Sequence, residues 1–132
     1  MHSAPGQNGF EYLLPDEESI ARCRNREQAT ALADAADVRS AAAELVREGY
    51  LLHYGDPRYY AIDDRDLALL AGDRLYAAGL AVLAEAGDAE AVGVLARLIA
   101  ACAEAHATGD APAADRIWRE SLAMLAADSS VD

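Results

Sequence analysis

The sequence contains no lysine, so all 11 of its basic residues are arginines, and 23 acidic residues bring the formal net charge to −12. A surface this acidic repels the phosphate backbone of nucleic acids, and it repels anionic membrane surfaces for the same reason. We therefore expect no nucleic acid and no membrane surface among the partners of this chain.

Cysteine is scarce as well, because Cys23 and Cys102 are the only two and neither belongs to a CxxC motif. Isolated cysteines of this kind are typical of buried, free thiols in a cytosolic protein. Residues 1–9 are polar and lack the apolar run of a signal peptide. These features predict a cytoplasmic protein.

The chemical motifs of common active sites are also missing. We find no metal-ligand spacing, no glycine-rich phosphate loop, no basic patch and no internal repeat, and the three histidines are scattered. Asp63, Asp64 and Asp66 cluster, but adjacent carboxylates splay around a helix, and a solvated helix N-terminus accounts for them more simply. The sequence therefore predicts no catalytic residue, no metal and no cofactor.

The residues that are abundant favour helices. Alanine, leucine, glutamate and arginine are strong helix formers, whereas valine, isoleucine and threonine are too sparse to build several strands. A length of 132 residues is typical of one domain. We predict an all-α fold, a bundle of about five helices over residues 16–127, with an extended arm at 1–15 and a polar tail at 128–132.

The most apolar stretch runs from residue 67 to residue 86, and its only charges before residue 85 are Asp73 and Arg74. A helix that is apolar almost all the way round is expected to be buried. The stretch is nearly long enough to span a membrane, but central charges cost about 2.5–3.5 kcal/mol each on insertion scales. We predict a core helix, without membrane insertion, on which the remaining helices pack.

The other predicted helices cover residues 16–36, 37–52 and 89–107, and a last one follows Pro112 to about residue 127. The connections are short, so consecutive helices should pack roughly antiparallel. Residues 53–62 form the main break, with the turn signal Gly55-Asp56-Pro57. Four of the six tyrosines lie in or beside this loop, which is either a lid on the core or, less commonly, a recognition surface.

One stretch resembles a known family. Residues 67–109 read LALLAGDRLYAAGLAVLAEAGDAEAVGVLARLIAACAEAHATG, which is similar to a helical pair of the trans-polyprenyl diphosphate synthases, and the similarity extends back towards residue 38. The positions that match are Leu69, Leu70, Ala71, Gly72, Asp73, Leu75 and Tyr76. This resemblance implies an isoprenoid-synthase-like partial core.

The catalytic motifs of that family are absent from this chain. The resemblance would require two DDxxD motifs that hold Mg²⁺ against a diphosphate, and the sequence has none. Glu44 and Glu48 stand four residues apart at the position expected for the first motif. A solvated helix face explains this pair more simply than a metal-binding role does. What the resemblance implies is the short, non-catalytic subunit of a heterodimeric synthase, with no condensation activity of its own.

Three functions remain open at this stage. The leading one is a non-catalytic interaction subunit whose partner is a second copy or a larger synthase subunit. The alternative is a small helical domain that binds an apolar ligand in an interhelical pocket lined by tyrosine and alanine, and a free-standing enzyme is the least supported. The candidate ligand or partner surface comprises Glu44, Glu48, Tyr54, Tyr59 and Tyr60.

The candidate partner interface comprises Gly72, Asp73, Tyr76 and Gly79 on the apolar helix. Gly72 and Gly79 lie seven residues apart, near one helix face, and would let a second helix approach closely. Asp73 sits in an apolar helix, so we expect it to be buried and to pair with an arginine of another helix or chain. These features predict a dimer that forms through this face.

Overall fold

The computed structural model describes residues 37–130, with side chains described to residue 127. Four α-helices make up this part of the chain: α4 (Val38–Tyr54), α5 (Arg65–Glu85), α6 (Ala89–Ala107) and α7 (Ala111–Ser130). The predicted all-α class is confirmed for these residues. The predicted arm at 1–15 and the predicted helix at 16–36 lie outside the described residues, and α7 extends into the predicted polar tail.

Local sequence signals explain where the helices begin and end. The side chain of an aspartate accepts a hydrogen bond from a backbone N–H of the first turn in all four described helices, at Asp37, Asp64, Asp88 and Asp110. Gly87 and Gly109 follow α5 and α6 with φ of 77°, a left-handed conformation that glycine adopts without strain. These caps place the four helices within three residues of the predicted bounds.

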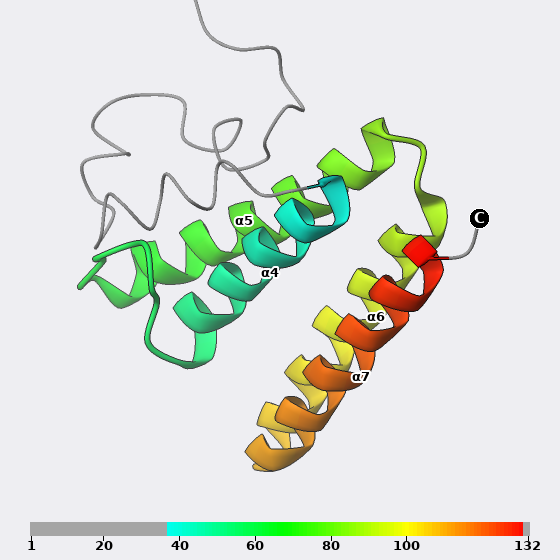
Figure 1. Cartoon of the computed structure of the whole chain (residues 1–132). Helices are drawn as coiled ribbons and strands as arrows, with labels where there is room; N and C mark the ends of the chain where they lie inside the picture. The colour runs from blue at the N-terminus through cyan, green and yellow to red at the C-terminus, as the bar shows by residue number, and fades with distance from the viewer. Residues whose placement is uncertain (1–36, 131–132) are drawn as a thin grey trace, which may run out of the picture.

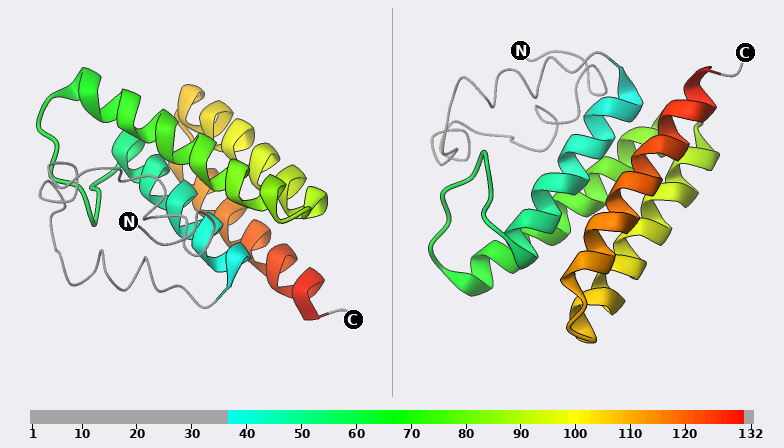
Figure 2. Two further views of the ribbon diagram at one scale, coloured as in Figure 1. Left: turned by 90° about the horizontal axis from the view of Figure 1, so that it is seen from above. Right: turned by 60° about the horizontal axis from the view of Figure 1, so that its bottom comes forward.

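The four helices form two antiparallel hairpins, α4–α5 and α6–α7 (Figure 1). The first hairpin lies across the second, and α5 as well as α4 packs against α6 (Figure 2). One core cluster joins α4 to α5 and the loop between them, and the other joins α4 and Leu83 of α5 to α6 and α7. Helices α4 and α5 therefore both contribute to the two clusters.

The predicted central helix, α5, has a different role from the one we expected. Its Leu75 and Leu83 are buried, but the Leu70 side chain is 63 % exposed and Leu67 is 43 % exposed. Helix α5 thus buries one side against its neighbours and leaves another apolar side in solvent. The prediction of a core helix on which the remaining helices pack therefore holds for one side of α5 only.

Glycines bring α4 and α5 into close contact. A Cβ atom on Gly72 would lie 2.9 Å from the backbone oxygen of Gly49, and one on Gly79 would lie 3.0 Å from the backbone oxygen of Ala42. The close helix approach that we predicted at Gly72 and Gly79 is present, but the approaching helix is α4 of the same chain. A second copy cannot use this face unless α4 moves away.

Candidate functional site

The loop between α4 and α5 is organised by a buried carboxylate. Glu48 is completely buried and accepts hydrogen bonds from the backbone N–H groups of Arg58 (3.1 Å), Tyr59 (2.8 Å) and Tyr60 (3.2 Å). A buried carboxylate is stable only when such donors surround it. The prediction that Glu48 lies on a solvated face is therefore wrong, and its observed role is to fix the loop.

Glu44 has the more exposed position that we predicted for both glutamates. Its Oε1 accepts a hydrogen bond of 2.8 Å from Nη2 of Arg58, and its side chain is 42 % exposed. The guanidinium of Arg58 also lies over the ring of Tyr59, at 5.0 Å from the ring centre. Burial raises the pKa of Tyr59, while the nearby Arg58 opposes the rise. Tyr60 is buried, so this loop mostly covers the core.

An aromatic cluster joins α4 to α6 and α7. The hydroxyl of Tyr50 lies 2.7 Å from Nε2 of His106, the ring of Tyr54 stacks on His106 at 4.1 Å, and Tyr50 meets Trp118 edge-on at 5.5 Å. Among the tyrosines of the predicted surface, Tyr54 is the most exposed, at 39 %. No local pattern pointed to His106, because its partners lie more than 50 residues away along the chain.

Asp73 does not occupy the buried position that we predicted. Its side chain is 67 % exposed, and its Oδ1 lies 3.0 Å from Nε2 of His53, at ion-pair distance but without hydrogen-bond geometry. The partner is thus a histidine of α4 rather than an arginine. The ring of His53 packs on Tyr76 at 5.2 Å, and burial holds the pKa of Tyr76 far above its usual value. Tyr76 therefore stays neutral and contributes packing.

The thiol nearest this cluster is not a nucleophile. Cys102 lies one helical turn before His106 on α6 and is 1 % exposed, and burial raises its pKa to about 11. The thiolate is the reactive form of cysteine, and very little of it is present at neutral pH with such a pKa. Within residues 37–130, no group of three or more histidine, cysteine, aspartate or glutamate side chains could hold a metal ion.

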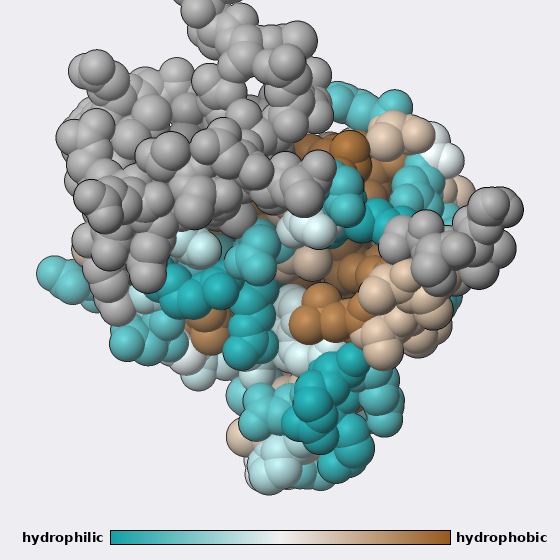
Figure 3. All heavy atoms as spheres, viewed as in Figure 1, coloured by the Kyte–Doolittle hydropathy of each residue, from teal (hydrophilic) through white to brown (hydrophobic). Residues whose placement is uncertain are grey.

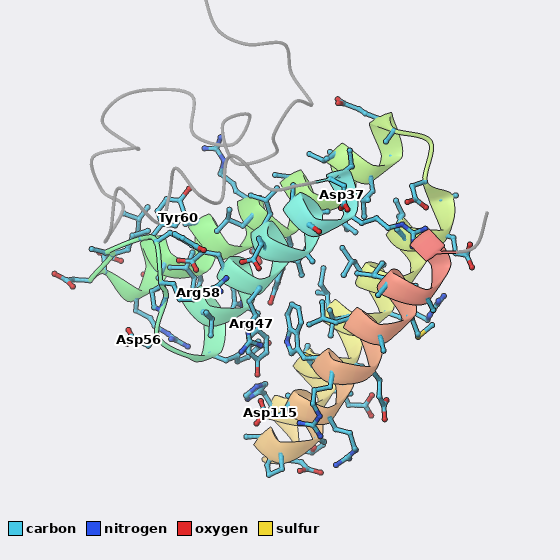
Figure 4. The ribbon with its side chains drawn as sticks, viewed as in Figure 1. Asp37, Arg47, Asp56, Arg58, Tyr60 and Asp115 are labelled. Carbon is cyan, nitrogen blue, oxygen red and sulfur yellow. The ribbon has the colours of Figure 1, made fainter. Side chains whose placement is uncertain are left out.

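A pocket of about 370 Å³ opens between α4 and α7. Figure 4 shows Arg47 reaching from α4 towards α7, where Asp115 lies across the gap. The surface in Figure 3 is hydrophobic between α4 and α7 and hydrophilic around the α6–α7 turn at the bottom. The pocket is lined by Ala43, Glu44, Arg47, Arg58, Asp115, Trp118, Arg119 and Leu122.

This pocket differs from the tyrosine-lined and alanine-lined one that we predicted. The guanidinium carbon of Arg47 lies 4.9 Å from the ring centre of Trp118 and 5.2 Å from that of Tyr50. Trp118 is buried, and its indole N–H has no hydrogen-bond acceptor among residues 37–130. A cationic and aromatic lining of this kind favours an anion over a purely apolar ligand.

Comparisons of this chain with protein-family models, with curated proteins and with solved structures find no match. The resemblance to the polyprenyl diphosphate synthases stays a prediction.

Proposed function

We propose that this chain is a non-catalytic helical interaction module, and that its partner binds the outer face of α5. We define this outer face by five exposed residues of α5 and one half-buried residue, Ala81; the exposed residues are Leu67, Leu70, Arg74, Ala77 and Ala84. The observation that carries the proposal is the exposure of the large residues in this set, 63 % for Leu70 and 43 % for Leu67. Contiguous apolar patches on soluble proteins commonly mark interaction sites.

A protein partner suits this face better than a lipid bilayer does. Helix α5 is the one helix within residues 37–130 that is long and apolar enough to cross a membrane, and 39 % of its most apolar window is buried inside the protein. Asp73 and Arg74 lie halfway along it, where charges oppose insertion. A protein surface can cover the aliphatic part of Arg74 while its guanidinium reaches water, and it can still cover Leu70.

The partner that fits best is a second copy of this chain. In an antiparallel pair related by a two-fold axis, Leu70 of one copy would face Ala81 of the other, and Leu67 would face Ala84. Alanine side chains are small and let another helix approach closely, so each leucine would fill the space above an alanine. A larger synthase subunit, the partner that the family resemblance implies, would compete for the same face.

Light scattering over a range of micromolar concentrations tests this proposal. We expect a dimer for the natural chain and a monomer for Leu70→Glu, because the charge would be placed within the contact. Met124→Glu is the matched control, since Met124 is 48 % exposed but lies on α7. Added salt should strengthen the dimer, because it screens the repulsion between two chains of net charge −12. A natural chain that is monomeric throughout, or a Met124→Glu chain that dissociates equally, would contradict the proposal.

A further inference from the structure

Two groups that line the α4–α7 pocket have no hydrogen-bond acceptor among the described residues, namely the half-buried guanidinium of Arg47 and the buried indole N–H of Trp118. We infer that this pocket binds a small monocarboxylate with an apolar body, its carboxylate meeting Arg47 and the indole N–H of Trp118. This inference uses a different surface from the outer face of α5, so it stands or falls independently of the proposed dimer.

Arg47 is the cationic anchor of the inferred site. Its guanidinium lies against the rings of Trp118 and Tyr50, and it has no ion pair among the described residues. Aromatic rings stabilise the positive charge but leave the five N–H donors of an arginine without conventional acceptors. A carboxylate matches the planar fork of these donors. In contrast, Arg58 already bonds Glu44 and is not free for a ligand.

Trp118 supplies a second and independent observation. The residue is 5 % exposed, and its Nε1 is buried without an acceptor in the part of the chain that the structure describes. Nearly all buried polar groups in proteins have a partner, so each exception calls for an explanation. An oxygen atom of a bound carboxylate would provide the missing acceptor. One ligand group would then satisfy both Trp118 and Arg47.

The rest of the lining specifies the ligand further. Leu122, Ala43 and the indole ring of Trp118 offer an apolar wall, and the volume of about 370 Å³ lies within the ~300–1,000 Å³ typical of small-molecule sites. Asp115 also lines the pocket and has no ion pair among the described residues. Its negative charge would oppose a second charge on the ligand, so a monocarboxylate should bind better than a phosphate dianion.

The sole tryptophan of the chain makes the site directly observable, because intrinsic fluorescence reports only on Trp118. We expect cyclohexanecarboxylate to produce a saturable change in emission at millimolar concentration. Acetate and inorganic phosphate lack the apolar body, and cyclohexanemethanol lacks the carboxylate. Each should bind at least about tenfold more weakly, the factor expected when one charged hydrogen bond or the apolar contact is lost. Sodium chloride at matched ionic strength should have no effect.

Variants then assign the binding to the named side chains. Arg47→Gln should weaken the binding of cyclohexanecarboxylate by about tenfold or more, since it removes a charged hydrogen bond. Arg119→Gln, an exposed position of the pocket, should weaken it less and cannot disturb the core. Arg97→Gln on α6 lies outside this pocket and should bind as the natural chain does. Asp115→Asn should strengthen the binding of phosphate.

Three results would overturn the inference. The first is the absence of a saturable response to cyclohexanecarboxylate. The second is equal binding of cyclohexanemethanol, which would show an apolar cavity without an anion site. The third is unchanged affinity in Arg47→Gln, provided that thermal unfolding shows the variant to be folded.

Discussion

At the scale of single residues, Glu48 has the largest consequence for the fold. Charged residues are almost never fully buried unless they are paired, so the sequence alone favoured a solvated position. Yet Glu48 lies three residues after Leu45 and four before Leu52, on the same helical stripe as these buried leucines. That spacing indicated a buried position, but the three backbone donors that satisfy the carboxylate belong to a loop whose path the sequence does not specify.

Replacing Glu48 with glutamine should be costly. In Glu48→Gln, one carboxylate oxygen becomes an NH₂ donor that faces backbone N–H groups, and the charge that attracts Arg58 is lost. We expect the free energy of unfolding to fall by about 3 kcal/mol, as for other broken buried charge pairs. Urea unfolding measures this change. Glu44→Gln is the control and should cost less than ~1 kcal/mol, because its ion pair with Arg58 is exposed. Equal losses in both variants would contradict the role of Glu48.

At the scale of helices, the sequence was enough to predict where each described helix begins and ends, but it was not enough to predict how the helices pack. Caps and turn glycines are local signals, and they placed each described helix within a few residues. Which helix is central is a non-local property. Helix α5 is apolar on two sides, and nothing in its sequence says that only one side is covered. Helix α4 looked amphipathic because Glu48 and Arg47 are charged, whereas both side chains in fact pack within the structure.

A pair of matched glycine substitutions tests the contact between α4 and α5. Gly72→Ala should lower the melting temperature, because a Cβ there would clash with the His53 ring and lie 2.9 Å from the backbone oxygen of Gly49. Overpacking of this kind costs about 1–3 kcal/mol. Gly93→Ala adds the same methyl group to α6, where the nearest atom is the flexible end of Arg97 at 3.4 Å. It should therefore stabilise the fold by up to ~1 kcal/mol. Equal stabilisation by both substitutions would mean that α4 is not this close to α5.

At the scale of the whole molecule, one arginine fastens the two hairpins together. Arg39 at the start of α4 donates two hydrogen bonds to the carboxylate of Asp88, at 2.6 and 2.9 Å, and a third to the backbone oxygen of Leu125, at 2.8 Å. Asp88 also caps α6, and Leu125 lies near the end of α7. A single side chain thus joins three elements that are 49 and 86 residues apart in sequence, which no local pattern could predict.

The pairing of Arg39 with Asp88 makes part of the stability depend on pH. The hydrogen bond from Arg39 holds the pKa of Asp88 below its ordinary value of 3.8. A carboxyl group whose pKa is lowered by folding stabilises the protein above the unfolded-state pKa, and this contribution is lost as the pH falls through the lower folded-state pKa. Stability from this pair is therefore complete at neutral pH and disappears only in strong acid.

The substitution Asp88→Asn isolates this effect, because asparagine still caps α6 but carries no charge. At neutral pH we expect the free energy of unfolding to fall by about 1–2 kcal/mol, the difference between a charged and a neutral hydrogen bond. Chemical unfolding over a series of pH values should show a constant difference in the free energy of unfolding between the two proteins down to about pH 3.8. This value is the ordinary pKa of the side chain. Below that value the gap should close, since Asp88 becomes protonated in the natural chain and then resembles asparagine. A gap that stays constant into strong acid would show that the charge of Asp88 contributes nothing to the contact between the hairpins.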